Sequence, residues 1–247
     1  MPTSSPSAAS LFDGWPETMI LSCLQGHMGT LNANHDGTAA AITVGDFCFL
    51  AGVPDAALVR AAAAPILVPR TEDWNGLIEG IYGRRVRPHT RYATEKNPEH
   101  LRPARLRGLA STPVGFEVVP IDAHIYDRLS LQRWSKDLRG LFDSAEDFER
   151  RGLGFAAIHR GAIVAGASAY TVYDGGIEIE VDTAPEVRRR GLASACAARL
   201  VLACLERGLY PSWDAHTRVS LALAEKLGYR STGGYRTYIK VSFGEEL

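Results

Sequence analysis

Apolar and polar positions follow a regular pattern in the second half of the chain. Two apolar runs joined by Arg160 and Gly161 predict a β-hairpin. The run 177–183 alternates apolar and acidic residues, which is typical of a strand with one buried face. A long apolar run then continues at helical spacing until Gly208 ends it. We predict strands over 115–121, 155–159, 162–173, 177–183, 210–214 and 235–241, and helices over 122–129, 144–151, 192–207 and 219–227.

The first half has shorter runs bounded by turn residues. They predict strands over 28–32, 39–44, 46–52, 66–68 and 84–95, and helices over 54–64 and 72–82. Residues 96–113 are rich in proline and arginine and poor in large apolar side chains, which favours a linker. We therefore divide the chain into a smaller N-terminal α/β domain, 1–110, and a second domain, 111–247.

Composition and charge narrow the class of protein. The chain has 247 residues, of which 46% are hydrophobic and 22% are charged, as in ordinary globular proteins. Its 27 basic and 28 acidic residues leave a net charge of -1, without the basic excess of a nucleic-acid-binding protein. The four cysteines are scattered and share no metal-ligand spacing with the histidines. We expect reduced thiols, no nucleic-acid partner and no bound metal.

The sequence shows neither the pattern of a signal peptide nor that of a membrane-spanning helix. Residues 1–10 lack the basic start and the apolar stretch of a signal peptide. The longest apolar run, 192–205, contains Arg199 and is shorter than the roughly 20 residues that a spanning helix needs. We therefore expect a cytoplasmic protein with no membrane partner.

The most informative stretch joins the predicted strand 177–183 to the predicted helix that begins at Leu192. Between them lie Pro185, three consecutive arginines and Gly191. The first turn of a helix offers unpaired N–H groups and a positive dipole end, which together bind anions. Gly191 also lets a phosphate approach the backbone closely. Rather than a solvated turn, we predict a phosphate site formed by Arg188, Arg189, Arg190, Gly191, Leu192, Ala193 and Ser194.

The pattern Arg188-x-x-Gly191-x-Ala193 resembles the cofactor loop of the GNAT acetyltransferase superfamily. The order of predicted elements over 114–241 and the ending Glu-Lys-Leu-Gly-Tyr at 225–229 also resemble this family. The resemblance implies an α/β fold whose mixed, mostly antiparallel sheet has helices on both faces. It also implies acetyl-CoA as the co-substrate and an N-acetyltransferase activity.

The implied reaction is direct attack of a neutral primary amine on the thioester. An amine near pKa 10 is mostly protonated at neutral pH, so a base must take its proton. Glu178, Glu180 and Asp182 share one face of the predicted strand, and we favour Glu180, then Glu178, as that base. The alternative is a solvated acidic face. The residues expected to hold the acetyl group and the rest of the cofactor are Val181, Asp182, Thr183 and Thr217.

Two positions depart from the family pattern. Thr217 stands where these enzymes often have Asn, and Ala224 stands where they often have the Tyr that protonates the departing thiolate. Ser220 lies one helical turn before Ala224 and is our candidate for the missing acid, with a surface serine as the alternative. Because of these two departures, a second function stays open: the protein could be non-catalytic and sense acyl-CoA or bind a partner.

The N-terminal domain repeats the order of elements of the cofactor half but has no Arg-x-x-Gly-x-Ala loop. We therefore interpret it as a degenerate GNAT half. A dinucleotide-binding domain is disfavoured because no Gly-x-Gly-x-x-Gly follows the first strand. The expected acceptor is an amine on a small molecule or a peptide, its identity is open, and a homodimer is also left open.

Overall fold

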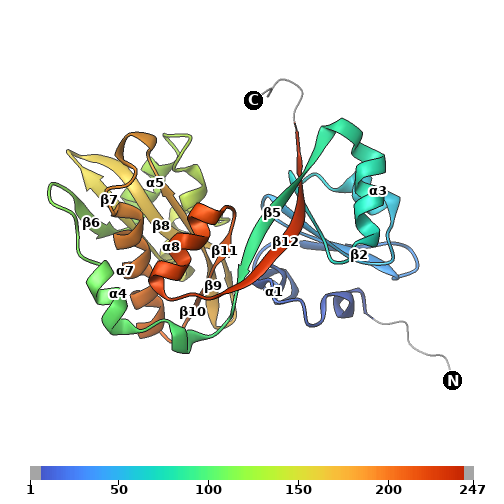
Figure 1. Cartoon of the computed structure of the whole chain (residues 1–247), viewed down its shortest axis with the longest axis horizontal. Helices are drawn as coiled ribbons and strands as arrows, with labels where there is room; N and C mark the ends of the chain where they lie inside the picture. The colour runs from blue at the N-terminus through green and yellow to red at the C-terminus, as the bar shows by residue number, and fades with distance from the viewer. Residues whose placement is uncertain (1–6, 242–247) are drawn as a thin grey trace. The chain divides into compact units, whose positions relative to one another are not determined.

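A computed structural model of the chain describes residues 7–241 (Figure 1). The chain divides into two compact units. Of the described residues, the second unit comprises 92–233, and the first unit comprises 7–91 together with 234–241. Each unit combines a sheet with helices, so the α/β class is confirmed.

The second unit is built on a five-stranded sheet in the order β10-β9-β8-β7-β6. Its strands are β6 (Glu117–Pro120), β7 (Gly154–His159), β8 (Ala162–Tyr173), β9 (Gly176–Thr183) and β10 (Tyr210–Ser212). Arg160 and Gly161, both at positive φ, form the predicted turn between β7 and β8. Neighbouring strands are antiparallel except for the parallel pair β9 and β10. The sheet is therefore mixed and mostly antiparallel, as predicted.

Helices cover both faces of this sheet. They are α4 (Pro103–Leu109), α5 (Ala123–Leu129), α6 (Ala145–Arg151), α7 (Leu192–Glu206), α8 (Arg218–Leu227) and the 3-10 helix η4 (Lys136–Arg139). On α7, Cys196 lies against Ala157, which pairs with Ala165 of β8. The next residue of β8, Gly166, faces Leu138 of η4. Because successive strand residues point to opposite faces, α7 and η4 lie on opposite sides of the sheet.

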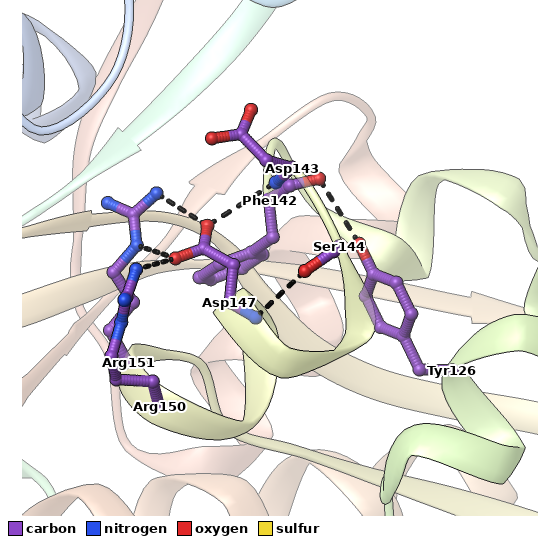
Figure 2. A network of polar contacts seen from close by, with 7 residues as sticks. All are labelled: Tyr126, Phe142, Asp143, Ser144, Asp147, Arg150 and Arg151. Atoms are coloured by element: carbon purple, nitrogen blue, oxygen red, sulfur yellow. Dashed lines mark hydrogen bonds and ion pairs between the residues drawn. The ribbon is translucent and has the colours of Figure 1, made fainter.

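A buried carboxylate, Asp147, organises helix α6 and the loop before it (Figure 2). Arg151 donates to both oxygens of Asp147, from Nε at 2.9 Å and from Nη2 at 2.7 Å, and Arg150 adds a bond at 2.6 Å. A side-chain cap begins the helix, since the Ser144 hydroxyl accepts from the N–H of Asp147 at 3.2 Å. The Arg151 guanidinium in turn stacks on Phe142, so the helix, its cap and the neighbouring loop form one connected group.

The strands of the first unit belong to a seven-stranded sheet. They are β1 (Thr30–Ala33), β2 (Ala39–Val44), β3 (Phe47–Gly52), β4 (Ile66–Pro69), β5 (Val86–Thr94) and β12 (Ser231–Lys240). Its helices are α1 (Thr18–Leu24), α2 (Ala56–Ala61) and α3 (Asp73–Tyr82). In the strand order β12 stands between β4 and β5, and it pairs antiparallel with β4. The last strand of the chain thus completes the core of the first unit, where Tyr238 is fully buried.

The predicted boundary between residues 110 and 111 does not coincide with this division. Helix α4 lies inside the segment that we predicted as a linker, and its Leu106 is fully buried. Helix α4 packs on α7, and Arg199 of α7 donates to the carbonyls of Ala110 at 3.2 Å and Val118 at 2.8 Å. The second unit therefore begins at Tyr92, and one strand from the end of the chain belongs to the first unit.

The two units share an order of elements. In the first unit an antiparallel pair, β2 and β3, is followed by α2, by β4 parallel to β3, and by α3. In the second unit the antiparallel pair β8 and β9 is followed by α7, by β10 parallel to β9, and by α8. This repetition is what the interpretation of the first unit as a degenerate half requires.

Candidate functional site

Strands β9 and β10 diverge in the middle of the second unit. Their parallel register runs from Tyr210 opposite Gly176 to Ser212 opposite Glu178, where β10 ends. Strand β9 continues to Thr183, whereas the chain after Ser212 forms β11 (Asp214–Ala215), which pairs with β5. Among the residues that the structure describes, one edge of β9 therefore has no strand partner beyond Glu178.

The direction of the backbone N–H groups along this free edge follows from the neighbouring strand. The N–H of Ala184 donates to Val164 at 2.9 Å, on the β8 side. Because N–H groups alternate in direction along a strand, those of Val181 and Thr183 point away from β8, toward the free edge. These are two of the residues predicted to hold the acetyl group, and their amide donors face the space where β10 has left the sheet.

Glu178 joins β9 to β11, the strand that follows β10. Its side chain is only 3% exposed, and its Oε1 accepts a hydrogen bond from the N–H of Asp214 at 2.9 Å. The carboxylate thus bridges β9 and β11 at the point where the pairing of β9 with β10 stops. Glu178 therefore has a structural role at the point where the free edge of β9 begins, in addition to its predicted role as the second candidate base.

Glu180 and Asp182 lie on the same face of β9 as Glu178, farther along the free edge, and both are half-buried. Oε1 of Glu180 accepts from the N–H of Val181 at 3.1 Å, and Oδ1 of Asp182 accepts from the N–H of Thr183 at 2.7 Å. The two carboxylates therefore sit directly on the two free-edge amides.

The surroundings of Asp182 act on its acidity in both directions. Burial raises the pKa of this carboxyl above its ordinary value, and the negative charge of Asp137 on η4 raises it further. The Thr183 amide and the Arg188 guanidinium oppose this shift without reversing it. Asp137 was not among the predicted site residues, because η4 is too short to leave a periodic signal in the sequence.

The loop after β9 leads to an uncapped helix. Arg188, Arg189 and Arg190 are exposed, and the Nε of Arg188 donates to the carbonyl of Thr183 at 3.3 Å. Gly191 precedes α7 at φ +81°, and no side chain caps the helix there. A methyl group at Gly191 would meet only Pro113, at 3.8 Å, so the space above the helix start is open. The 15 residues of α7 supply a dipole whose positive end faces this space.

The residues at this helix start fit a phosphate group. Leu192, Ala193 and Ser194 form the first turn, whose N–H groups have no partner inside the helix. Lys226 of α8 donates to the Ser194 hydroxyl at 3.2 Å and so adds a positive charge that the sequence analysis missed. The buried hydroxyl oxygen of Thr183 also finds no hydrogen-bond partner among residues 7–241. Together these groups could bind an elongated anionic ligand along the free edge of β9.

The model of the GNAT acetyltransferase family matches residues 9–238. The chain belongs to the GNAT acetyltransferase family. The match extends through both units, and the family resemblance and the GNAT fold predicted from sequence are confirmed.

Solved and curated proteins agree with this assignment. A GCN5-related N-acetyltransferase-like protein from Streptococcus suis 89/1591 is 45% identical, with a TM-score of 0.90 over 94% of this chain and 96% of that one. An uncharacterized N-acetyltransferase, YdfB of Bacillus subtilis (strain 168), is 33% identical over 99 residues, which are 39% of this chain and 38% of the relative. A GCN5-related N-acetyltransferase from Kribbella flavida, 18% identical with a TM-score of 0.55 over 98% of each chain, is similar in fold.

The remaining predicted residues of this GNAT site lie at the start of α8. The Thr217 hydroxyl caps this helix by accepting from the N–H of Ser220 at 3.2 Å. The Ser220 hydroxyl accepts from the Trp213 indole at 3.1 Å, so its own proton remains available to a further acceptor. Ala224, at the position of the family's tyrosine, is fully buried.

Among the described residues no group of three or more His, Cys, Asp or Glu side chains is arranged to hold a metal ion. No helix within residues 7–241 is long and apolar enough to cross a membrane.

Proposed function

We propose that this GNAT acetyltransferase is an acetyl-CoA-dependent N-acetyltransferase that modifies a primary amine of a small molecule or peptide in the cytoplasm. The proposal rests on two features that follow one another along the chain, the free edge of β9 and the start of α7. The uncapped start of α7 fits the pyrophosphate, and the free edge of β9, which ends at Thr183 shortly before the helix, carries two amide donors. One ligand lying along β9 would reach both.

The chain supplies specific groups for this chemistry. The arginine loop and the first turn of α7 would bind the phosphates, and the Val181 and Thr183 amides would polarise carbonyl oxygens of the bound molecule. Bound acetyl-CoA supplies the activated acetyl group. Glu180 lies beside the polarising amide and would accept the proton of the incoming ammonium. Ser220, whose hydroxyl is held by Trp213, remains the candidate donor to the departing sulfur.

The cofactor site is tested by filling it. We expect Gly191→Trp to place a bulky side chain where the phosphates would lie, so that acetyl-CoA no longer raises the Tm. The matched control is Gly208→Trp, because Gly208 ends the same helix at φ +70° and also faces open space. Both variants carry the same backbone strain, so a difference between them reports ligand binding. Equal stabilisation of both variants by acetyl-CoA would contradict the proposal.

The second candidate function is a non-catalytic acyl-CoA sensor, which the buried Ala224 at the tyrosine position favours. Release of free CoA thiol in the presence of a panel of amines separates the two functions. Turnover with any amine supports the transferase, whereas binding of acetyl-CoA without thiol release across the panel supports the sensor.

A further inference from the structure

The two amide donors on the free edge of β9 are occupied by the strand's own side chains. Glu180 accepts from the N–H of Val181 at 3.1 Å, and Asp182 accepts from the N–H of Thr183 at 2.7 Å. In each case a carboxylate bonds to the amide of the next residue. A carbonyl oxygen that binds to one of these amides must therefore compete with a charged acceptor of this chain.

The Val181 amide is the first on the free edge beyond Glu178, the last residue of β9 that pairs with β10, so it is the amide that we assign to the acyl oxygen. A hydrogen bond to a carboxylate is stronger than one to a neutral carbonyl. A thioester oxygen approaching Val181 must therefore displace the Glu180 carboxylate, and the carboxylate then loses a bond that stabilised its charge.

We propose that Glu180 is a latch on the Val181 amide, and that the carbonyl oxygen of the acyl donor opens this latch and releases Glu180 to act as the proton acceptor. This inference rests on the proposed function. The released carboxylate takes one proton from the acceptor ammonium, and the neutral nitrogen then forms the C–N bond while the C–S bond breaks. Ser220 gives its hydroxyl proton to the departing thiolate and takes the second nitrogen proton in its place, and Glu180 returns its proton to water.

The latch makes binding of the acyl donor depend on pH. A carboxylate that loses a donor N–H has a higher pKa, so Glu180 takes up protons when the thioester displaces it. Charged side chains of both signs lie on the neighbouring elements, and because they are present whichever ligand binds, they do not distinguish acetyl-CoA from CoA. Asp182 shares its face of β9, η4 carries Lys136, Asp137 and Arg139, and the loop carries Arg188, whereas the β8 partner opposite Glu180, Ser168, does not titrate.

Isothermal titration calorimetry in two buffers of different ionisation enthalpy, at about pH 5.5, measures this proton uptake. We expect the protein to take up more protons with acetyl-CoA than with CoA, which has the same phosphates but no thioester carbonyl. In Glu180→Gln the difference should disappear, because the amide side chain does not titrate at this pH. An equal proton uptake with the two ligands overturns the latch.

Affinity gives a second, independent readout. Glu180→Ala removes the competitor, so we expect the Kd for acetyl-CoA to fall roughly three- to tenfold, while the Kd for CoA changes less. Asp182→Ala is the matched control, since it removes the same charge from the same face of the strand and should change both Kd values by a similar factor. Parallel changes of both Kd values in Glu180→Ala overturn the latch alone. Failure of the wild-type protein to bind acetyl-CoA would instead overturn the proposed function.

Discussion

Four acidic residues of the second unit show how the surroundings of a carboxylate decide its role. Glu178 is buried and tied to a neighbouring strand, and Asp147 is buried and paired with two arginines. Glu180 and Asp182 are half-buried and accept hydrogen bonds from amides that a ligand could also use. The first two carboxylates hold elements in place, whereas the second two lie where chemistry is proposed.

Asp147 gives the residue-scale prediction. Hydrogen bonds from Arg151, together with Arg150, hold the pKa of this carboxyl well below its usual range. A group whose pKa is lowered in the folded state adds stability above its unfolded pKa of about 3.9 and loses it as the pH falls below that value. We expect Asp147→Asn to cost on the order of 2 kcal/mol of unfolding free energy at pH 7 and much less near pH 2.

Urea unfolding followed across this pH range, with Asp127→Asn as an exposed control on the neighbouring helix α5, checks the prediction. A cost for Asp147→Asn that stays the same at every pH would mean that the lost contribution is packing and not the charge pair.

At the scale of elements, the starts of corresponding helices differ between the two units in a way that bears on the proposed phosphate site. In the first unit Asp55 caps α2 by accepting from the N–H groups of Ala57 at 2.7 Å and Leu58 at 3.1 Å. The Asp55 carboxylate therefore lies at the helix start, where a bound anion would otherwise accept from these N–H groups. In the second unit Gly191 leaves the start of α7 open. This difference supports the interpretation of the first unit as a half that has lost its cofactor role.

The start of α8 gives the element-scale prediction. Because the Thr217 hydroxyl caps this helix, we expect Thr217→Ala to lower the free energy of unfolding by about 1 kcal/mol and Thr217→Ser to restore most of it. Val219→Ala in the same helix is the control, since Val219 is 81% exposed and should change stability little. Thermal unfolding of the three variants measures the effect, and an unchanged Tm in Thr217→Ala would show that the cap contributes nothing.

At the scale of the whole molecule, the last strand decides which fragments can fold. Strand β12 pairs with β4 through Tyr238 opposite Leu67 and Ile239 opposite Ile66, and Tyr238 is fully buried in the core of the first unit. A fragment that ends at residue 110 lacks this strand, although composition places a domain boundary there. Without β12, the core of the first unit has an open sheet edge and a cavity the size of a tyrosine side chain. Such a cavity lowers the free energy of unfolding by an amount on the order of 3–5 kcal/mol.

We therefore expect the fragment 7–110 to give the NMR spectrum of an unfolded chain. A fragment of residues 7–91 joined by a Gly/Ser linker to residues 234–241 supplies the missing strand segment and should give dispersed amide signals. A folded 7–110 fragment, or no gain from the added strand, would contradict the role given to β12.

The sequence by itself determined the local features of this protein. The hairpin at Arg160-Gly161, the buried helix after Gly191 and the shared face of Glu178, Glu180 and Asp182 all follow from periodicity and turn residues, which act between near neighbours. They were enough to indicate the GNAT fold and the arginine loop.

Only the tertiary structure decided the arrangements that depend on distant residues. The use of β12 by the first unit joins residues more than 160 positions apart, as Tyr238 and Leu67 show, and no local pattern encodes such a pairing. The packing of α4 on α7 likewise turned a proline-rich segment into part of the second unit. The three carboxylates of β9 have separate roles because β10 leaves β9 after Glu178. At that point Glu178 is buried against Asp214. The amides beside Glu180 and Asp182 lie farther along, on the free edge of the strand.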